Sequence, residues 1–97
     1  EGATQAPTIE SQGFLEKKGT SLYKERYFRT QIAAYEVVLR AAPQSQQTKQ
    51  KLADLHYEIA KLAIESGDDE KAKKELQAAL QLIPDHAEAK KTLLHLE

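Results

Sequence analysis

Residues 53–86 read ADLHYEIAKLAIESGDDEKAKKELQAALQLIPDH, and this stretch decides the fold. On either side of Ser66 and Gly67, apolar residues recur at three- and four-residue steps, the spacing of one face of an α-helix. Glycine can adopt the left-handed backbone angles that close a helix, and Asp68 can cap the helix that follows. Pro84 ends the second helix. The stretch therefore predicts two helices joined by a short turn and packed antiparallel as a hairpin.

The same helical spacing continues on both sides of this hairpin. Its first helix is expected to begin near Ser45, and an earlier helix is expected to end at Pro43. Asp85 and Glu88 have the spacing of a capping box, which predicts a last helix. Strand-like alternation is lacking, so the chain is predicted to be all-α. The expected apolar faces are Phe28, Ile32, Tyr35, Val38 and Leu39; Leu52, Leu55, Ile59, Leu62 and Ala63; Ala72, Leu76, Ala79, Leu80 and Ile83; and Ala89, Leu93, Leu94 and Leu96.

Residues 53–86 resemble one 34-residue tetratricopeptide repeat (TPR). Small residues at the helix crossing allow close approach, and larger residues fill the groove beside them. His56 departs from the family pattern, because a large residue such as Trp is usual there. The residues that carry the resemblance are Ile59, Ala60, Ala63, Gly67, Asp68, Ala72, Leu76, Ala79 and Pro84.

Two further segments resemble parts of the same repeat. Residues 12–45 resemble a degenerate copy, in which Arg26 stands where the turn glycine is expected. Residues 46–52 are an insert that lengthens the central helix, and residues 87–97 resemble the opening of a third unit, a capping helix. The resemblance implies antiparallel hairpins stacked as a short right-handed superhelix over residues 12–97. Residues 1–11 are polar and aperiodic, and are expected to form a flexible linker.

The composition excludes some classes of protein and disfavours others. The chain has 97 residues and a net charge of -1, whereas a nucleic-acid binder needs an excess of Lys and Arg. It has no cysteine, so disulfides and thiolate metal sites are excluded. No apolar run approaches the ~20 residues that cross a bilayer, so we expect a soluble chain without a membrane span. The N-terminus with Pro7 fits a tether after an export signal or lipid anchor, as in an exported or membrane-anchored bacterial protein; the compartment stays open.

The polar residues form no catalytic or metal-binding pattern. His56, His86 and His95 lack the i, i+4 spacing that places two imidazoles on one ion. The acidic run at residues 68–70 opens a helix, where the helix dipole stabilises negative charge. Glycine-rich phosphate loops and serine-nucleophile motifs are missing. We therefore expect no enzymatic activity, no cofactor and no metal.

A basic and aromatic cluster near the N-terminus leaves a nucleic-acid interface as an alternative to a protein surface. Basic and aromatic side chains together can bind single-stranded nucleic acid, but the carboxylates of Glu16 and Glu25 dilute the positive charge. A protein-interaction surface or partly buried helix ends are preferred. The cluster comprises Lys17, Lys18, Tyr23, Lys24, Arg26, Tyr27, Phe28 and Arg29.

The TPR resemblance implies a scaffold or adaptor that binds a partner peptide or protein in the concave groove formed by the first helix of each unit. Glu16 and Thr20 stand where some family members carry a Lys and Asn clamp, which argues against a clamp for a partner's C-terminal carboxylate. Alternatively, the side chains of Tyr57 and Ile64 pack against a neighbouring helix or another protomer and do not contact a partner peptide. The residues expected in the groove are Glu16, Thr20, Tyr23, Asp54, Tyr57, Lys61, Ile64, Glu88 and Lys91, with His95 as a further candidate.

Two other readings of the chain stay open. Two repeats and a cap fall below the roughly three units that an independent solenoid needs, so a homodimer could complete the core. The chain is then a structural self-association unit, or else the end of a longer repeat protein.

Overall fold

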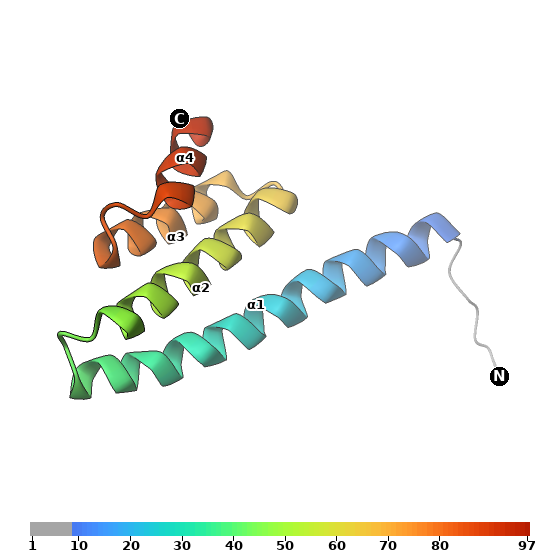
Figure 1. The fold of residues 1–97 in the computed structure, drawn as a ribbon. Helices are drawn as coiled ribbons and strands as arrows, with labels where there is room; N and C mark the ends of the chain where they lie inside the picture. Colours follow the sequence, from blue (N-terminus) through green and yellow to red (C-terminus); the bar gives the residue numbers. More distant parts are fainter. Residues whose placement is uncertain (1–8) are drawn as a thin grey trace.

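The computed structural model describes the backbone of residues 9–97 and the side chains of residues 22–97. Four helices follow one another, with no strand in residues 9–97: α1 (Ile9–Ala41), α2 (Gln46–Glu65), α3 (Asp69–Leu82) and α4 (Ala87–Leu96). Each helix packs on its neighbour in the chain, α1 on α2, α2 on α3 and α3 on α4 (Figure 1). The all-α class is confirmed. Residues 1–8 of the expected linker lie outside the described part, and residues 9–11 belong to α1.

The first helix differs from the hairpin that the resemblance implied for residues 12–45. It is one continuous helix of 33 residues that runs antiparallel to α2 and extends past its end (Figure 1). The segment has Arg26 at the turn position and no proline before Pro43. An isolated glycine such as Gly19 costs a helix only about 1 kcal/mol relative to alanine, so nothing in the segment forces a reversal.

The predicted punctuation around α2 and α3 is confirmed. The Ser45 hydroxyl caps α2 by accepting a hydrogen bond from the Thr48 amide at 3.2 Å. Gly67 has a φ of +82° in the turn. The Asp68 amide donates to the Ala63 carbonyl at 2.8 Å, which gives a hydrogen-bond partner to a backbone carbonyl at the end of α2. The Asp68 carboxylate then accepts from the Lys71 amide at 3.1 Å and caps α3.

Small residues form the centre of the hairpin core, as the repeat pattern predicted. Ala60 on α2 and Ala72 and Ala79 on α3 are fully buried, so no side chain holds the two helices apart. Leu76 is fully buried in the same cluster, and Ala89 joins it from α4. Close packing of this kind supplies most of the stability of a small helical domain.

A second buried cluster joins α1 to α2. Ile32 packs against Leu52 and Ile59, and three partly buried residues of α1 lie around them: Phe28, Tyr35 and Leu39. Two residues that were predicted to face the core are instead exposed, Val38 on α1 and Leu94 on α4. Helix α1 packs mainly on α2 and helix α4 mainly on α3, which leaves much of the circumference of each helix in solvent.

The start of α4 corrects the predicted capping box. His86, not Asp85, is the N-cap residue, and its side chain accepts a hydrogen bond from the Ala89 amide. Asp85 lies in the preceding turn and is exposed. The side chain at position 86 is aimed into the fold and only 5% of the residue is exposed. The cap is therefore made by an imidazole nitrogen in place of a carboxylate.

None of the four helices, over the residues that are described, is both long enough and apolar enough to cross a membrane.

Candidate partner-binding surface

His86 is the buried centre of a polar cluster between α2 and α4. Its Nε2 lies 2.9 Å from Oδ1 of Asp54 on α2, and its Nδ1 lies 3.1 Å from the Ala89 amide nitrogen. Because the amide can only donate, Nδ1 must be the acceptor and Nε2 must carry the proton given to Asp54. The Nδ1 atom also lies 3.7 Å from a carboxylate oxygen of Glu88. This arrangement holds the beginning of α4 against the middle of α2.

An aromatic ring lies beside this cluster on α2. The Tyr57 ring centroid is 5.6 Å from that of the His86 imidazole, and the Lys61 ammonium lies 5.1 Å from the Tyr57 centroid. The Lys61 ammonium also lies 3.1 Å from the Glu58 carboxylate, and both side chains are largely accessible to solvent. Tyr57 is half-buried against the α2–α3–α4 core, so its ring is held in place while part of the residue stays accessible. The result is an aromatic surface with charges around it, here called the α2–α4 surface and defined by Asp54, Tyr57, Lys61, His86 and Glu88.

The fold brings together four of the residues that were expected to line the groove: Asp54, Tyr57, Lys61 and Glu88 all border the α2–α4 surface. Ile64, two turns after Tyr57, is half-buried against the same core. Packing on neighbouring helices, the alternative considered for Tyr57 and Ile64, therefore occurs for both side chains. Lys91 is exposed on α4, and His95, also exposed, bonds to the Lys91 carbonyl at 3.0 Å.

The groove residues expected from the first unit are positioned differently. Tyr23 lies on α1 and is 74% exposed. It precedes Phe28 by five residues, about 140° around the helix, and so points away from α2. The backbone of Glu16 and Thr20 is part of α1, but the structure describes side chains only from residue 22 onward. Because α1 is continuous, there is no separate first helix to carry these three residues to the α2–α4 surface.

A polar network that the sequence analysis missed joins three helices. Glu75 on α3 accepts from Nδ1 of His56 on α2 at 2.7 Å and from the guanidinium of Arg29 on α1 at 2.5 Å. Only 10% of the Glu75 side chain is exposed. Burial alone would raise the pKa of Glu75, but the hydrogen bonds from His56 and Arg29 and the charge of Arg29 outweigh it and lower the pKa. The carboxylate is therefore held in its ionised form inside the fold.

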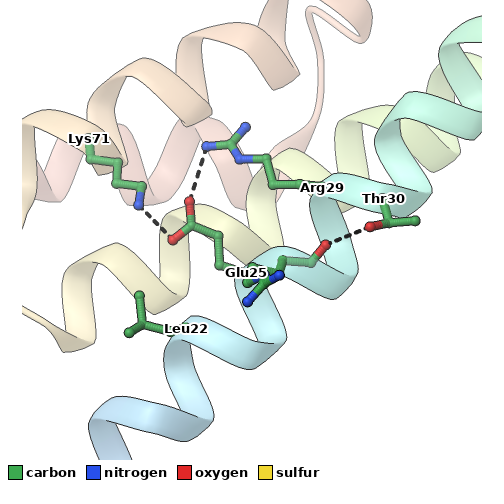
Figure 2. A pocket seen from close by; sticks show the side chains of 6 residues that line it. Leu22, Glu25, Arg29, Thr30 and Lys71 are labelled. Carbon is green, nitrogen blue, oxygen red and sulfur yellow. Dashed lines mark hydrogen bonds and ion pairs between the residues drawn. The ribbon is translucent and has the colours of Figure 1, made fainter.

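The network continues along α1 through Glu25. Its carboxylate lies 2.6 Å from the Lys71 ammonium of α3 and 3.4 Å from the Arg29 guanidinium (Figure 2). Burial by itself would lower the pKa of Arg29, but the hydrogen bonds and charges of Glu75 and Glu25 raise it. An open cleft of about 520 Å³ lies between α1 and α3 here, lined by Leu22, Glu25, Arg26, Arg29, Thr30 and Lys71.

A signal for this network was present in the sequence. His56 falls in register with Leu52, Ile59 and Ala63 on the apolar stripe of α2, and Glu75 falls between Ala72, Leu76 and Ala79 on that of α3. A polar residue in each of two facing stripes indicates a buried pair, since an unpaired buried charge is costly.

The site residues carry no indication of metal chemistry. In residues 22–97, no three candidate ligands from His, Asp and Glu gather closely enough to hold an ion. Comparison with protein-family models finds no match, and comparison with curated proteins finds no relative.

Proposed function

We propose that this chain is a protein-interaction module, a scaffold or adaptor of TPR type, that binds a partner peptide or protein on the α2–α4 surface. The observation that carries the proposal is the fixed Tyr57 ring between His86 and Lys61, with charged side chains around it. Tyrosine offers a large contact area at a low cost in conformational entropy, and is enriched among the residues that dominate binding energy.

The arrangement favours a partner segment that carries an acidic residue on one side of an apolar residue and a basic residue on the other. Lys61 offers an ammonium on one side of Tyr57, while Asp54 and Glu88 offer carboxylates on the side of His86. A partner segment with an apolar residue over Tyr57, an acidic residue near Lys61 and a basic residue near Asp54 would pair with all of them. Charges placed in this way fix the direction in which a peptide lies.

The surface is also preorganised. His86 is hydrogen-bonded through both ring nitrogens, and Tyr57 rests on the core formed by the buried alanines. Binding then orders few additional side chains of this chain, which reduces the entropic cost of association. The hairpin α2–α3 followed by α4 supports the TPR assignment, because the first helix of each unit, α2 and then α4, contributes to one shared surface.

The proposal is tested by affinity capture from an extract of the native organism, read by quantitative mass spectrometry. Lys61→Glu reverses the charge beside Tyr57 without changing a core residue. The amount of a specific partner that is captured should therefore fall by about tenfold or more. Lys74→Glu, an exposed substitution on α3, is the matched control and should leave capture unchanged. A set of captured proteins that is identical for the two variants would exclude the α2–α4 surface as the binding site.

A further inference from the structure

The long helix α1 has a second apolar face that no part of residues 22–97 covers. Its members follow a 4-3-4-3-4 spacing and none is charged: Tyr23, Tyr27, Thr30, Ala34, Val37 and Ala41, here called the outer stripe. All six are exposed, and Tyr23, Tyr27 and Val37 have exposed fractions of 74%, 56% and 57%. Val38, 49% exposed, widens the stripe by one residue.

The outer stripe lies on the opposite side of α1 from α2. The face toward α2 is formed by Phe28, Ile32, Tyr35 and Leu39, which recur with the same spacing about half a turn away. A solvated helix that packs on one neighbour needs only one apolar face. A repeat of 3.5 residues is typical of a seam between two helices, and this one runs for about 27 Å along α1.

The charges at the borders of the outer stripe have one sign. The positions that flank it are 24, 31 and 38 on one side and 26, 33 and 40 on the other. Among these six, the charged residues are Lys24, Arg26 and Arg40, all exposed cations. The nearby carboxylate of Glu25 points toward α3 and is paired with Lys71 and Arg29, so it is not a free negative charge (Figure 2).

The cleft between α1 and α3 adjoins this border, and inside it the Glu25 carboxylate is paired with Lys71 and Arg29. Arg26 and Thr30 line the cleft as well as bordering or belonging to the outer stripe, and Lys71 lies on its other wall. Acidic side chains projecting from a helix on the stripe would reach Arg26 first and then the mouth of the cleft. Leu22, 58% exposed, adds an apolar contact at the same edge.

We propose that the outer stripe docks an amphipathic α-helix of another protein whose apolar seam is flanked by Asp and Glu. The seam supplies apolar contact, and the opposite charges at its borders select the partner, as the flanking positions of coiled coils do. A second copy of this chain fits less well, because it offers only Lys24, Arg26 and Arg40 at the same borders. In an antiparallel pair that sets Thr30 against Ala34, Arg26 would lie beside the second copy's Arg40. This surface is separate from the α2–α4 surface and does not depend on the function proposed for it.

The probes are two synthetic helical peptides of about 21 residues with the same Leu and Ala seam, one with Glu and one with Lys at all flanking positions. Binding of each to the full chain is measured by calorimetry at about 0.05 M and 0.5 M salt. The Glu peptide should bind at least about tenfold more tightly than the Lys peptide, and the difference should shrink at high salt. Equal binding of both peptides, or binding of neither, would overturn the proposal.

Variants of the chain locate the binding. Val37→Glu places a charge in the seam and should weaken binding of the Glu peptide by about tenfold or more. Leu94→Glu, at an even more exposed position on α4, should have no effect. The double variant Arg26→Glu with Arg40→Glu should reverse the preference in favour of the Lys peptide. All four substituted positions are solvent-exposed, so circular dichroism should show an unchanged fold. If the double variant keeps the wild-type preference, the charge border is not the selecting feature and the proposal fails.

Self-association and the α2–α4 surface are separated in the same experiment. Sedimentation equilibrium without peptide should show a monomer; a dimer that Val37→Glu abolishes would mean that a second copy covers the stripe, and would overturn the proposal. Lys61→Glu should leave binding of the Glu peptide unchanged, because Lys61 lies on α2. Loss of peptide binding in Lys61→Glu would place the probe on the α2–α4 surface instead.

Discussion

The imidazole of His86 is hydrogen-bonded to the carboxylate of Asp54 at 2.9 Å, across 32 residues of sequence. The same imidazole caps α4 through its other nitrogen, which lies 3.1 Å from the Ala89 amide. One buried side chain therefore begins a helix and attaches it to α2.

Replacing this side chain should destabilise the protein. His86→Ala removes the cap and leaves the buried Ala89 amide without an acceptor, so the free energy of unfolding should fall by about 1–2 kcal/mol. His86→Asn restores a cap acceptor, since asparagine is a favoured N-cap residue, and should recover part of the loss. Urea denaturation followed by circular dichroism measures both. Equal losses for the two variants would show that the cap contributes little.

Acidification should reduce stability through Glu75. A carboxyl whose pKa is lower in the folded chain than in the unfolded chain stabilises the fold while it is ionised. Its contribution is complete above the ordinary value of 4.5 and is lost as the pH falls through the lower folded value. Glu75→Gln should therefore lower the free energy of unfolding by about 1–2 kcal/mol at neutral pH, and the difference from wild type should shrink as the pH falls below 4.5.

The control for this pH dependence is Glu70→Gln. Glu70 lies in the first turn of the same helix with 84% of its side chain exposed and only a 3.9 Å contact to Lys73. Urea titrations at a series of pH values should show a smaller difference between wild type and Glu70→Gln than between wild type and Glu75→Gln, because at Glu70 an exposed carboxylate loses only its interaction with the helix dipole. A pH-independent gap between wild type and Glu75→Gln would contradict an ionised, hydrogen-bonded Glu75.

Enlarging a buried alanine should separate helices α2 and α3. Ala79 is fully buried where the two helices approach, so Ala79→Leu forces three additional carbon atoms into a filled space. We expect a loss of about 1–3 kcal/mol in the free energy of unfolding. Ala33→Leu makes the same change at an exposed position of α1 and should be nearly neutral. Similar thermal midpoints for the two variants would argue against close packing at Ala79.

The turn between α2 and α3 depends on the backbone of Gly67. Its φ is +82°, and a Cβ built there would meet nothing within 4 Å, so any cost of substitution comes from the backbone alone. Gly67→Ala should lose about 1 kcal/mol of stability, and Gly67→Asn should lose less because asparagine tolerates the left-handed region. Thermal unfolding of the two variants should place Asn between Gly and Ala. An alanine variant as stable as wild type would mean that the turn has another conformation.

The parts of the fold that follow from local chemistry could be predicted from the sequence. Ser45, Gly67 and Asp68 end or begin helices through their own side chains or backbone, and each occupies its predicted place. The continuous α1 could not be predicted from the repeat frame, because that frame assumes a reversal for which the chain supplies no turn residue at Arg26. Residue type alone predicts Asp85 as the cap, whereas the neighbouring His86 is buried and caps α4 instead.

The candidate site was only partly predictable for a related reason. Asp54, Tyr57 and Lys61 share one face of α2 by helical spacing, which the sequence contains. The contact of Asp54 with His86 and that of Glu75 with Arg29 join different helices, and depend on how those helices pack. Spacing along one helix carries no information on which residue of another helix lies opposite.

Because α1 packs on α2, α2 on α3 and α3 on α4, nearly every tertiary contact joins neighbouring segments of the chain. Topologies with such low contact order fold quickly, in microseconds to milliseconds, since few long loops must close before contacts form. We expect the α2–α3 hairpin to serve as the folding nucleus, with the flanking helices adding afterwards. The ten-residue α4 would then be the first of the packed elements to exchange its amide hydrogens, with His86 setting the rate at which it detaches.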